Sequence, residues 1–195
     1  MIQRKHISKS NIIFILLITL AVVTWISPAV KITLIRSLMA VGAFKPDPEA
    51  YTRHPEVFTR LPDYSYRDTS GNIISLSRLK NKVVFINYWA TWCIPCLAEM
   101  PSVNKLFTRF KNNPKVVFII VDTDNNPTKA SAYLQKNHFS LPLYTSLSKF
   151  PDTLLNGAIP TTLIFGKDGK LKYKHTGAAD YNSDKFKDFL EKEMN

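Results

Sequence analysis

Apolar residues in this chain occur in two arrangements, uninterrupted runs and stripes at helical spacing. The run Val83–Trp89 is broken only by Asn87 and predicts a central strand buried on both faces. A second run, residues 115–121, predicts another buried strand. Between the two runs, four apolar residues at helical spacing predict a helix packed on the sheet: Val103, Leu106, Phe107 and Phe110. A strand, a helix and a strand in this order are typical of a parallel α/β sheet.

Shorter patterns predict further elements on both sides of this centre. Before it, a hairpin at 64–67 and 72–74 leads into a helical turn at 75–79. After it come a helix at 127–136, a strand at 141–145, an antiparallel hairpin at 161–165 and 170–175, and a closing helix that starts near Asn182 or Ser183.

The N-terminal part contains the longest stretch without charge. No charged residue occurs from Asn11 to Val30, and the 21 residues between Lys9 and Lys31 would span roughly 31 Å as a helix, about one bilayer core. The residues before this stretch include Arg4, Lys5 and Lys9 but no acidic residue. By the positive-inside rule, a single-pass helix would place the N-terminus in the cytoplasm and the rest on the periplasmic or extracytoplasmic side of the cell (inner) membrane. A cleaved signal peptide ending near Ser27-Pro28-Ala29 is the alternative, and it also exports the domain.

Charge and proline content divide the chain into three parts. Residues 1–45 hold six Lys/Arg and no Asp/Glu, so more than half of the net charge of +11 lies beside the predicted membrane anchor. Within this part, residues 32–44 predict either a helix along the membrane surface or an extension of the anchor. Residues 46–61 contain three prolines and predict a linker, and residues 62–195 predict one domain. Its charges are mixed in sign without a basic cluster, which argues against nucleic-acid binding.

The only two cysteines, Cys93 and Cys96, closely follow the run Val83–Trp89. Residues 97–100 favour a helix, so Cys93 is predicted at a helix N-terminus with Pro95 in the first turn, where its missing N–H is harmless. Unpaired amides and the helix dipole favour a thiolate there, and Cys93 is the predicted nucleophile. Cys96, one turn deeper, is placed to attack a mixed disulfide at Cys93 and release the partner.

Two non-catalytic interpretations of the pair are weaker. A four-residue disulfide loop stabilises a fold by roughly 2 kcal/mol, against roughly 3 kcal/mol for a fifteen-residue loop, so a structural bridge would be better placed elsewhere. A zinc site needs four ligands, and His54, His138 and His175 lack metal-type spacing. We therefore expect no metal and no separate cofactor, with the Cys93–Cys96 disulfide as the redox group.

The segment from Trp89 to Pro101, WATWCIPCLAEMP, resembles the active-site signature of the membrane-anchored TlpA/ResA-like thiol-disulfide oxidoreductases of the thioredoxin-fold superfamily. The resemblance extends less sharply over residues 61–195. It implies a thioredoxin-like α/β fold, a central mixed sheet flanked by helices with an N-terminal transmembrane helix, and an extra strand and helix within residues 116–155. It also implies a membrane thiol electron donor, disulfide-containing extracytoplasmic protein substrates and, in some members, a role in cytochrome c maturation.

The resemblance further implies roles for residues beside the pair. Pro160 matches a proline that is cis in this superfamily and packs against the cysteines, and the backbone of Ile159 would pair with a substrate strand. Glu99 matches a glutamate that could exchange the proton of Cys96, although its position alone is also that of an exposed helical residue. Asn87 stands where thioredoxin has a buried aspartate, so thioredoxin's proton-transfer scheme does not carry over.

Taken together, these residues predict a membrane-tethered disulfide reductase with substrate contacts at Trp92, Pro95, Ile159 and Pro160. Core packing alone would explain Trp89, and His138 and His175 are expected at the surface or at element ends. A peroxiredoxin-like thiol peroxidase is one alternative, but its Thr-x-x-Cys spacing is absent. A non-catalytic tethered chaperone or metal-binding domain is the other.

Overall fold

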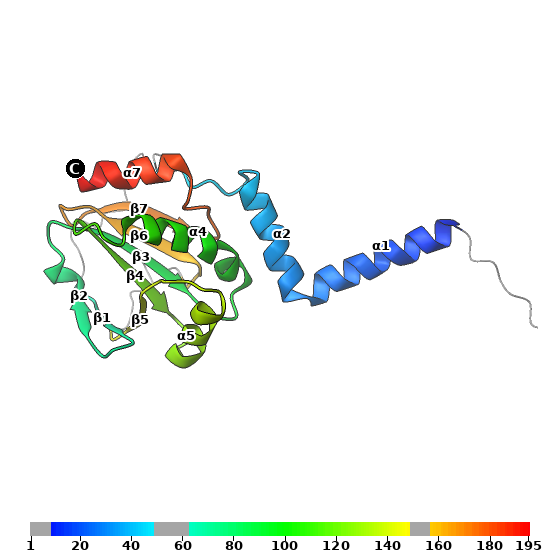
Figure 1. Ribbon diagram of the computed structural model, residues 1–195, viewed down its shortest axis with the longest axis horizontal. Helices are drawn as coiled ribbons and strands as arrows, with labels where there is room; N and C mark the ends of the chain where they lie inside the picture. Colours follow the sequence, from blue (N-terminus) through cyan, green and yellow to red (C-terminus); the bar gives the residue numbers. More distant parts are fainter. Residues whose placement is uncertain (1–8, 49–62, 149–156) are drawn as a thin grey trace, which may run out of the picture.

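The computed structural model describes residues 9–48, 63–148 and 157–195, which form one mixed sheet, the helices around it and an N-terminal helical arm (Figure 1). The strands are β1 (Ser65–Asp68), β2 (Ile73–Ser75), β3 (Val83–Trp89), β4 (Val116–Asp122), β5 (Leu143–Ser146), β6 (Thr161–Phe165) and β7 (Leu171–Thr176). The helices are α1 (Lys9–Ile26), α2 (Pro28–Ala40), the 3₁₀ turn η1 (Leu76–Arg78), α4 (Ile94–Phe110), α5 (Pro127–Lys136) and α7 (Asp184–Met194).

The seven strands lie in the order β2-β1-β5-β4-β3-β6-β7. β3, β4 and β5 are parallel and are joined through α4 and α5, which confirms the predicted crossovers. The hairpin of β6 and β7 and the hairpin of β1 and β2 are antiparallel, as predicted. β5 begins two residues later than predicted, because Pro142 has no N–H to donate to a neighbouring strand.

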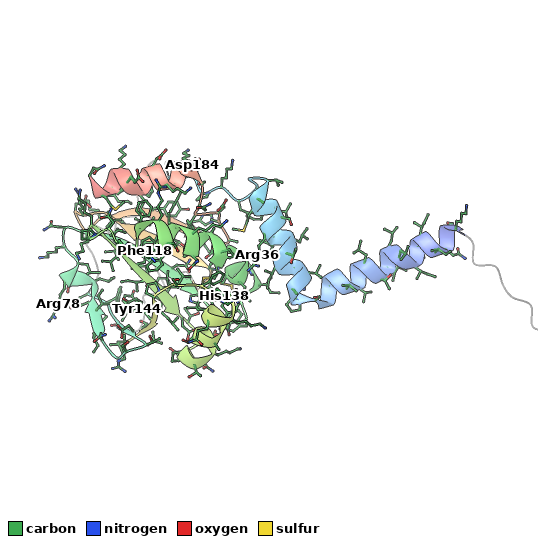
Figure 2. All side chains as sticks on the ribbon, viewed as in Figure 1. Arg36, Arg78, Phe118, His138, Tyr144 and Asp184 are labelled. Atoms are coloured by element: carbon green, nitrogen blue, oxygen red, sulfur yellow. A yellow bond between two sulfur atoms is a disulfide. The ribbon has the colours of Figure 1, made fainter. Side chains whose placement is uncertain are left out.

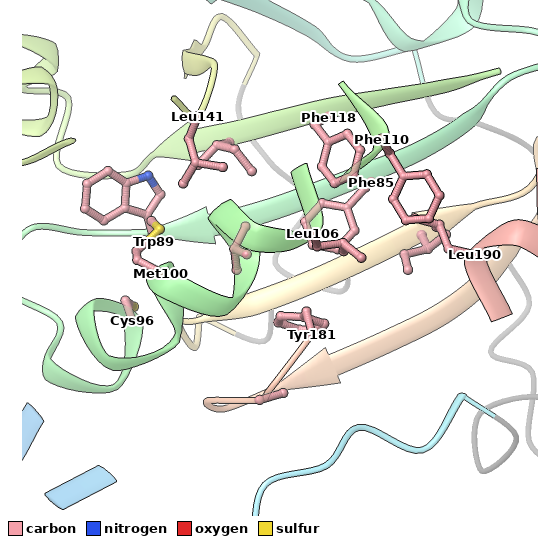
Figure 3. Close-up of a cluster of buried hydrophobic side chains, with 14 of the residues drawn as sticks. Phe85, Trp89, Cys96, Met100, Leu106, Phe110, Phe118, Leu141, Tyr181 and Leu190 are labelled. Carbon is pink, nitrogen blue, oxygen red and sulfur yellow. The ribbon is translucent and has the colours of Figure 1, made fainter. Parts of the chain in front are cut away.

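Both faces of the sheet are buried at β3, whose seven residues are at most 1% exposed. On one face, Phe85 and Phe118 pack with Leu106 of α4 in a cluster that also includes side chains of α5 and α7 (Figure 3). On the other face, Ile86 packs in a second cluster with Tyr66 of β1 and Leu76 of η1. The central strand is therefore fixed from both sides.

The N-terminal arm differs from the single helix predicted across residues 11–30. The chain breaks after Ile26, and a new helix begins at Pro28, bent by 92° from the first. Proline cannot donate the N–H that would continue α1, but its fixed φ suits the first position of α2. Taken singly, no described helix is long and apolar enough to cross a bilayer, whereas the bent pair Lys9–Val23 and Pro28–Ala40 passes that test by length and composition.

α2 packs against α4, and the chain that follows α2 continues along the domain (Figure 2). Arg36 of α2 donates from Nη2 to the backbone carbonyl of Leu97 in α4 at 2.9 Å. The Asp180 amide donates to the Phe44 carbonyl at 2.9 Å. Thus the described part of the predicted linker, residues 46–48, continues from a segment bound to the domain, and residues 49–61 lie outside the described residues.

Candidate active site

The two cysteines lie where the chain passes from β3 to α4. Cys93 is the N-cap residue of α4, and its Sγ accepts a hydrogen bond from the Cys96 amide at 3.2 Å. The two residues are joined by a disulfide with their Cα atoms 5.2 Å apart. Pro95 stands within the first turn, which leaves the Cys96 amide directed at the Cys93 sulfur. The predicted helix N-terminus is therefore confirmed, and the amide favours negative charge on Cys93 once the disulfide is reduced.

Both cysteines are buried, Cys96 more completely than Cys93. Cys93 is 4% exposed and Cys96 is fully buried, while the neighbouring Trp92 is 68% exposed. Trp92 therefore lies on the surface beside the pair, whereas Trp89 is buried in the core with its ring centre 5.6 Å from that of Tyr133. Of the two tryptophans, only Trp92 presents an apolar face to an incoming protein.

The loop before β6 faces the pair. The Ile159–Pro160 peptide bond is cis, as the resemblance implied, and the Ile159 carbonyl oxygen lies 3.7 Å from Cys93 Sγ. Pro160 is buried and Ile159 is half-buried. The structure thus brings four of the predicted residues to one edge of the domain: Trp92, Cys93, Ile159 and Pro160.

Glu99 lies on α4 three residues after Cys96, and its carboxyl group is fully buried rather than exposed. Its Oε1 accepts from Asn87 Nδ2 at 2.8 Å, and its Oε2 accepts from the Ala179 amide at 3.1 Å. Burial raises the pKa of Glu99 to about 8, with these two donors opposing the shift. A carboxyl group in this range can both accept and return a proton near neutral pH.

Asn87 connects Glu99 to the sheet. Besides Glu99, its side-chain amide donates to Thr162 Oγ1 of β6 at 2.9 Å. Burial and the nearby charge of Glu99 also raise the pKa of Tyr173 and Tyr181 well above the ordinary range, so both phenols stay protonated. Glu99 is therefore the group in this buried polar cluster that can change charge near neutral pH.

The sequence did not point to three other contacts around the pair. Asp124 accepts from the Thr91 amide at 2.9 Å and from the Thr91 hydroxyl at 2.6 Å, which braces the turn before Cys93. The other two are the Ala179 amide on Glu99 and Arg36 on the Leu97 carbonyl. Of these three contacts, only the one from Asp124 could have been inferred from the sequence. Asp124 closely follows β4, and the carboxyl ends of the parallel strands β3 and β4 must lie side by side.

The structure describes two histidines, His138 and His175. His138 follows the C-terminus of α5 with a φ of 56°, an element-end position as predicted. His175 is the penultimate residue of β7, close to the predicted element end; it is half-buried, its ring stacks on Tyr173, and burial lowers its pKa. His54 lies outside the described residues. Among the residues that the structure describes, no three His, Cys, Asp or Glu side chains come together as a metal site.

A cysteine pair at the mouth of the helix after a central strand, opposite a cis-proline, defines a thioredoxin-fold oxidoreductase. More particularly, the chain belongs to the Redoxin family, whose pattern matches residues 56–190. Together with the relatives below, this match shows an oxidoreductase of the ResA/TlpA type.

Two bacterial relatives and one solved structure illustrate the likeness. The chain is 32% identical over 123 residues to the thiol-disulfide oxidoreductase ResA of Bacillus cereus, covering 63% of this chain and 70% of that protein. It is 29% identical over 119 residues to the thioredoxin-like protein YneN of Bacillus subtilis, covering 60% and 70%. The crystal structure of the thioredoxin domain of a thiol-disulfide oxidoreductase from Bacteroides vulgatus superposes on this chain with a TM-score of 0.56. The superposition covers 70% of this chain and 96% of the Bacteroides domain at 21% identity, and it supports the fold.

Proposed function

We propose that this protein reduces disulfides in other proteins outside the cytoplasm, using Cys93 and Cys96 as its redox group without a separate cofactor. The observation that carries the proposal is the asymmetry of the pair. Cys93 caps α4 beside the Ile159 carbonyl and the exposed Trp92, whereas Cys96 is fully buried. A partner disulfide that docks beside Trp92 therefore meets Cys93 before Cys96.

The reaction proceeds in two exchange steps. The Cys93 thiolate attacks one sulfur of the partner disulfide, a mixed disulfide forms, and the second partner sulfur leaves as a thiolate. The Cys96 thiolate then attacks Cys93 Sγ, which releases the first partner sulfur and closes the Cys93–Cys96 bond. Two electrons have passed to the partner, and the enzyme is left in the oxidised state of the structure. A thiol donor must reduce the pair again.

Glu99 serves the second step. Cys96 must lose its proton before it can attack, and both Cys96 and Glu99 are fully buried, one helical turn apart on α4. A neutral thiol and a carboxylate are the reactants, and a thiolate and a neutral carboxyl group are the products. Because burial raises the pKa of Glu99 to about 8, this transfer is far less unfavourable than it would be to an ordinary glutamate.

Substrate contacts come from the edge around Cys93. Trp92 offers an exposed aromatic face, and the half-buried Ile159 places its backbone next to the reacting sulfur. Pro160 shapes the loop before β6, and Pro95 lies in the first turn of α4 at the same edge. An extended partner segment could lie along Ile159 and donate a backbone hydrogen bond to its carbonyl.

The N-terminal arm anchors the protein to the cell membrane with the redox domain on the extracytoplasmic side. α1 is apolar on all sides, and most of its large apolar side chains are exposed: Ile12, Ile13, Phe14, Ile15, Leu16, Leu17, Ile18, Leu20, Val22 and Val23. At the corner with α2, Trp25 is 80% exposed and Lys31 Nζ lies 5.7 Å from its ring centre, a pairing suited to the membrane–water interface. Because α2 is bent by 92° from α1, it can lie along the membrane surface while α1 enters the bilayer.

The partners follow from this location. The substrates are extracytoplasmic proteins with disulfides, and a membrane-embedded thiol protein supplies the electrons. Relatives named ResA are thiol-disulfide oxidoreductases, which supports this class of partner. By the resemblance to the TlpA/ResA-like group, apocytochrome c is one candidate substrate.

Trapping the mixed disulfide tests the proposal. In cells that express Cys96→Ser, Cys93 can attack but nothing resolves the product, so a dithiothreitol-sensitive adduct with another protein should accumulate. Cys93→Ser is the matched control and should form none. If both variants lack the adduct while the wild type turns over, the assigned order of attack is wrong.

Two further measurements separate the competing functions. Stoichiometric, thiol-dependent consumption of hydroperoxide by the purified protein would indicate a peroxidase. Insulin reduction no faster than that by dithiothreitol alone would indicate a non-catalytic domain.

For the location, carbonate extraction should leave the chain in the membrane fraction, and external protease should digest the C-terminal domain in spheroplasts. Release by carbonate, or full protection from protease, would contradict it.

A further inference from the structure

Pro101 leaves one backbone carbonyl inside the active-site helix without its usual amide donor. In an α-helix the amide of residue 101 would donate to the carbonyl of residue 97, but proline has no N–H. The carbonyl concerned belongs to Leu97, the residue directly after Cys96. The helical turn that carries the cysteines therefore lacks one of the hydrogen bonds that would join it to the rest of α4.

Two side chains from other helices donate to this carbonyl instead. Arg36 of α2 donates from Nη2 at 2.9 Å, and Tyr133 of α5 donates from its hydroxyl at the longer distance of 3.4 Å. Arg36 lies 61 residues before Leu97 in the chain, so the contact exists only because α2 packs on α4. A charged donor at the shorter distance makes the stronger of the two bonds.

Apolar side chains on the inward face of α2 pack on the domain on either side of Arg36. Ile32, Arg36 and Met39 follow one another at helical spacing; Ile32 packs against the core cluster that contains both cysteines, and Met39 is 6% exposed. Leu34 and Leu38 on the outward side are 50% and 41% exposed. The arginine is thus seated between two apolar contacts that fix its helix against α4.

The contact also brings charge close to the redox pair. Within the residues that the structure describes, no carboxylate forms an ion pair with Arg36, and its guanidinium lies against the Leu97 carbonyl, directly after Cys96. The other titratable groups around the pair are Glu99 on α4, Tyr133 on α5 and Asp124 after β4. Arg36 is the cation among these contacts, and it favours the thiolate over the thiol.

We propose that Arg36 is a positioning residue of the redox site: from α2 it supplies the hydrogen bond that Pro101 denies to Leu97 and so fixes the turn that carries the cysteines. This role rests on the proposed function only in that Cys93 is the reacting thiol. α2 is then part of the redox site as well as a connection to α1, and a movement of the arm would change the reactivity of the pair.

A double-mutant cycle tests the proposal on the full chain, purified in mild detergent and reduced with dithiothreitol. The variants are Arg36→Met, Pro101→Ala and the two combined, because alanine at this position restores the missing helix donor. The first readout is the rate of Cys93 alkylation by iodoacetamide across a pH series. The second is hydrogen exchange of the Leu97 amide, which donates to the Cys93 carbonyl at 3.0 Å.

Arg36→Met should slow alkylation about tenfold at a pH below the thiol pKa, the equivalent of one pKa unit, and should speed exchange of the Leu97 amide. Adding Pro101→Ala should recover most of the exchange protection, and Arg36→Lys, which keeps a charged donor, should recover most of both. Lys45→Met removes an exposed charge from the same arm and should stay within about twofold of the wild type.

The proposal is overturned if Arg36→Met matches Lys45→Met in both readouts, or if its effect on exchange is as large in the Pro101→Ala background as in the wild-type background. Failure of the proposed function looks different. In that case wild-type Cys93 would react no faster than a free cysteine, while the exchange of the Leu97 amide would still report on Arg36. If Arg36→Met does not fold, Arg36→Lys against Arg36→Gln compares a charged with a neutral donor in the same two measurements.

Discussion

Two carboxyl groups are buried among the described residues, Glu99 and Asp122, and they have different surroundings. Each accepts two N–H donors, and burial raises the pKa of each. The donors of Asp122 are the amides of Asp124 and Asn126, both at 3.0 Å, in the turn that follows at once. The donors of Glu99 come from distant parts of the chain, Asn87 and Ala179.

The difference separates a folding role from a chemical one. Asp122 closes the loop that starts α5 and satisfies amides that would otherwise be unpaired. Within the described ranges, Glu99 accepts no hydrogen bond from a loop amide near it in sequence, and it lies one helical turn from the buried Cys96. Burial alone does not make a carboxyl group useful for catalysis; the reacting atom beside it does.

The largest expected effect is on the pH dependence of stability. Glu99 has a pKa of about 8 in the folded protein against an ordinary value of 4.5, so the folded state binds its proton more tightly. This stabilising contribution is complete below pH 4.5 and is lost as the pH rises to about 8, on the order of a thousandfold in the folding equilibrium constant.

Urea unfolding of the oxidised full chain in mild detergent at a series of pH values measures this loss, with the disulfide intact so that no thiol titrates. Glu99→Gln should flatten the fall in stability over that interval. Parallel curves for the variant and the wild type would show that Glu99 titrates normally, and it would then be no better a proton acceptor than an exposed glutamate.

The next effect is on the rate of turnover. Glu99→Gln keeps the shape of the side chain but cannot accept a proton, so the second exchange step should slow about a hundredfold. Stopped-flow release of the partner from a preformed Cys93 mixed disulfide measures that step alone. Asp122→Asn is the matched control and should release the partner at the wild-type rate; equal slowing in both variants would indicate a general loosening of the fold.

Much of the fold could be predicted from the sequence because its signals are local. Val83–Trp89 is apolar enough to require burial on both faces, and the spacing around Phe107 permits only one helical face toward the sheet. The break before Pro28 was visible in the sequence as well, but the apolar content of the flanking residues favoured a single helix.

The site could be predicted only in part because its contacts span the chain. Cys93 caps α4 and Cys96 lies in its first turn, so their arrangement follows from spacing alone. The burial of Glu99 depends on a backbone amide 80 residues away, and the Leu97 carbonyl meets an arginine 61 residues before it. Helical spacing places Glu99 on a face of α4 but does not say what covers that face.

A smaller effect is expected when the loop at Asp122 is opened. Asp122→Ala leaves the buried amides of Asp124 and Asn126 without their acceptor, which should cost about 1–3 kcal/mol of unfolding free energy. The urea midpoint measures this loss at a pH where the wild type is fully folded. Partner release by the folded variant should remain at the wild-type rate. Slower release without a loss of stability would show that Asp122 has a chemical role like that assigned to Glu99.

The smallest effect concerns how the distant donors tune Glu99. The Asn87 amide lowers the pKa of Glu99 against the larger contribution of burial, so Asn87→Ala should raise that pKa further. The pH at which partner release accelerates should then move upward by about one unit, the scale of a single hydrogen bond to a charged group. Thr162→Val is the matched control, because it removes the other acceptor of the Asn87 amide but leaves the bond to Glu99 in place. If the two variants shift the profile equally, Asn87 acts through the packing of β3 on β6, and its contact with the carboxyl group has no separate effect.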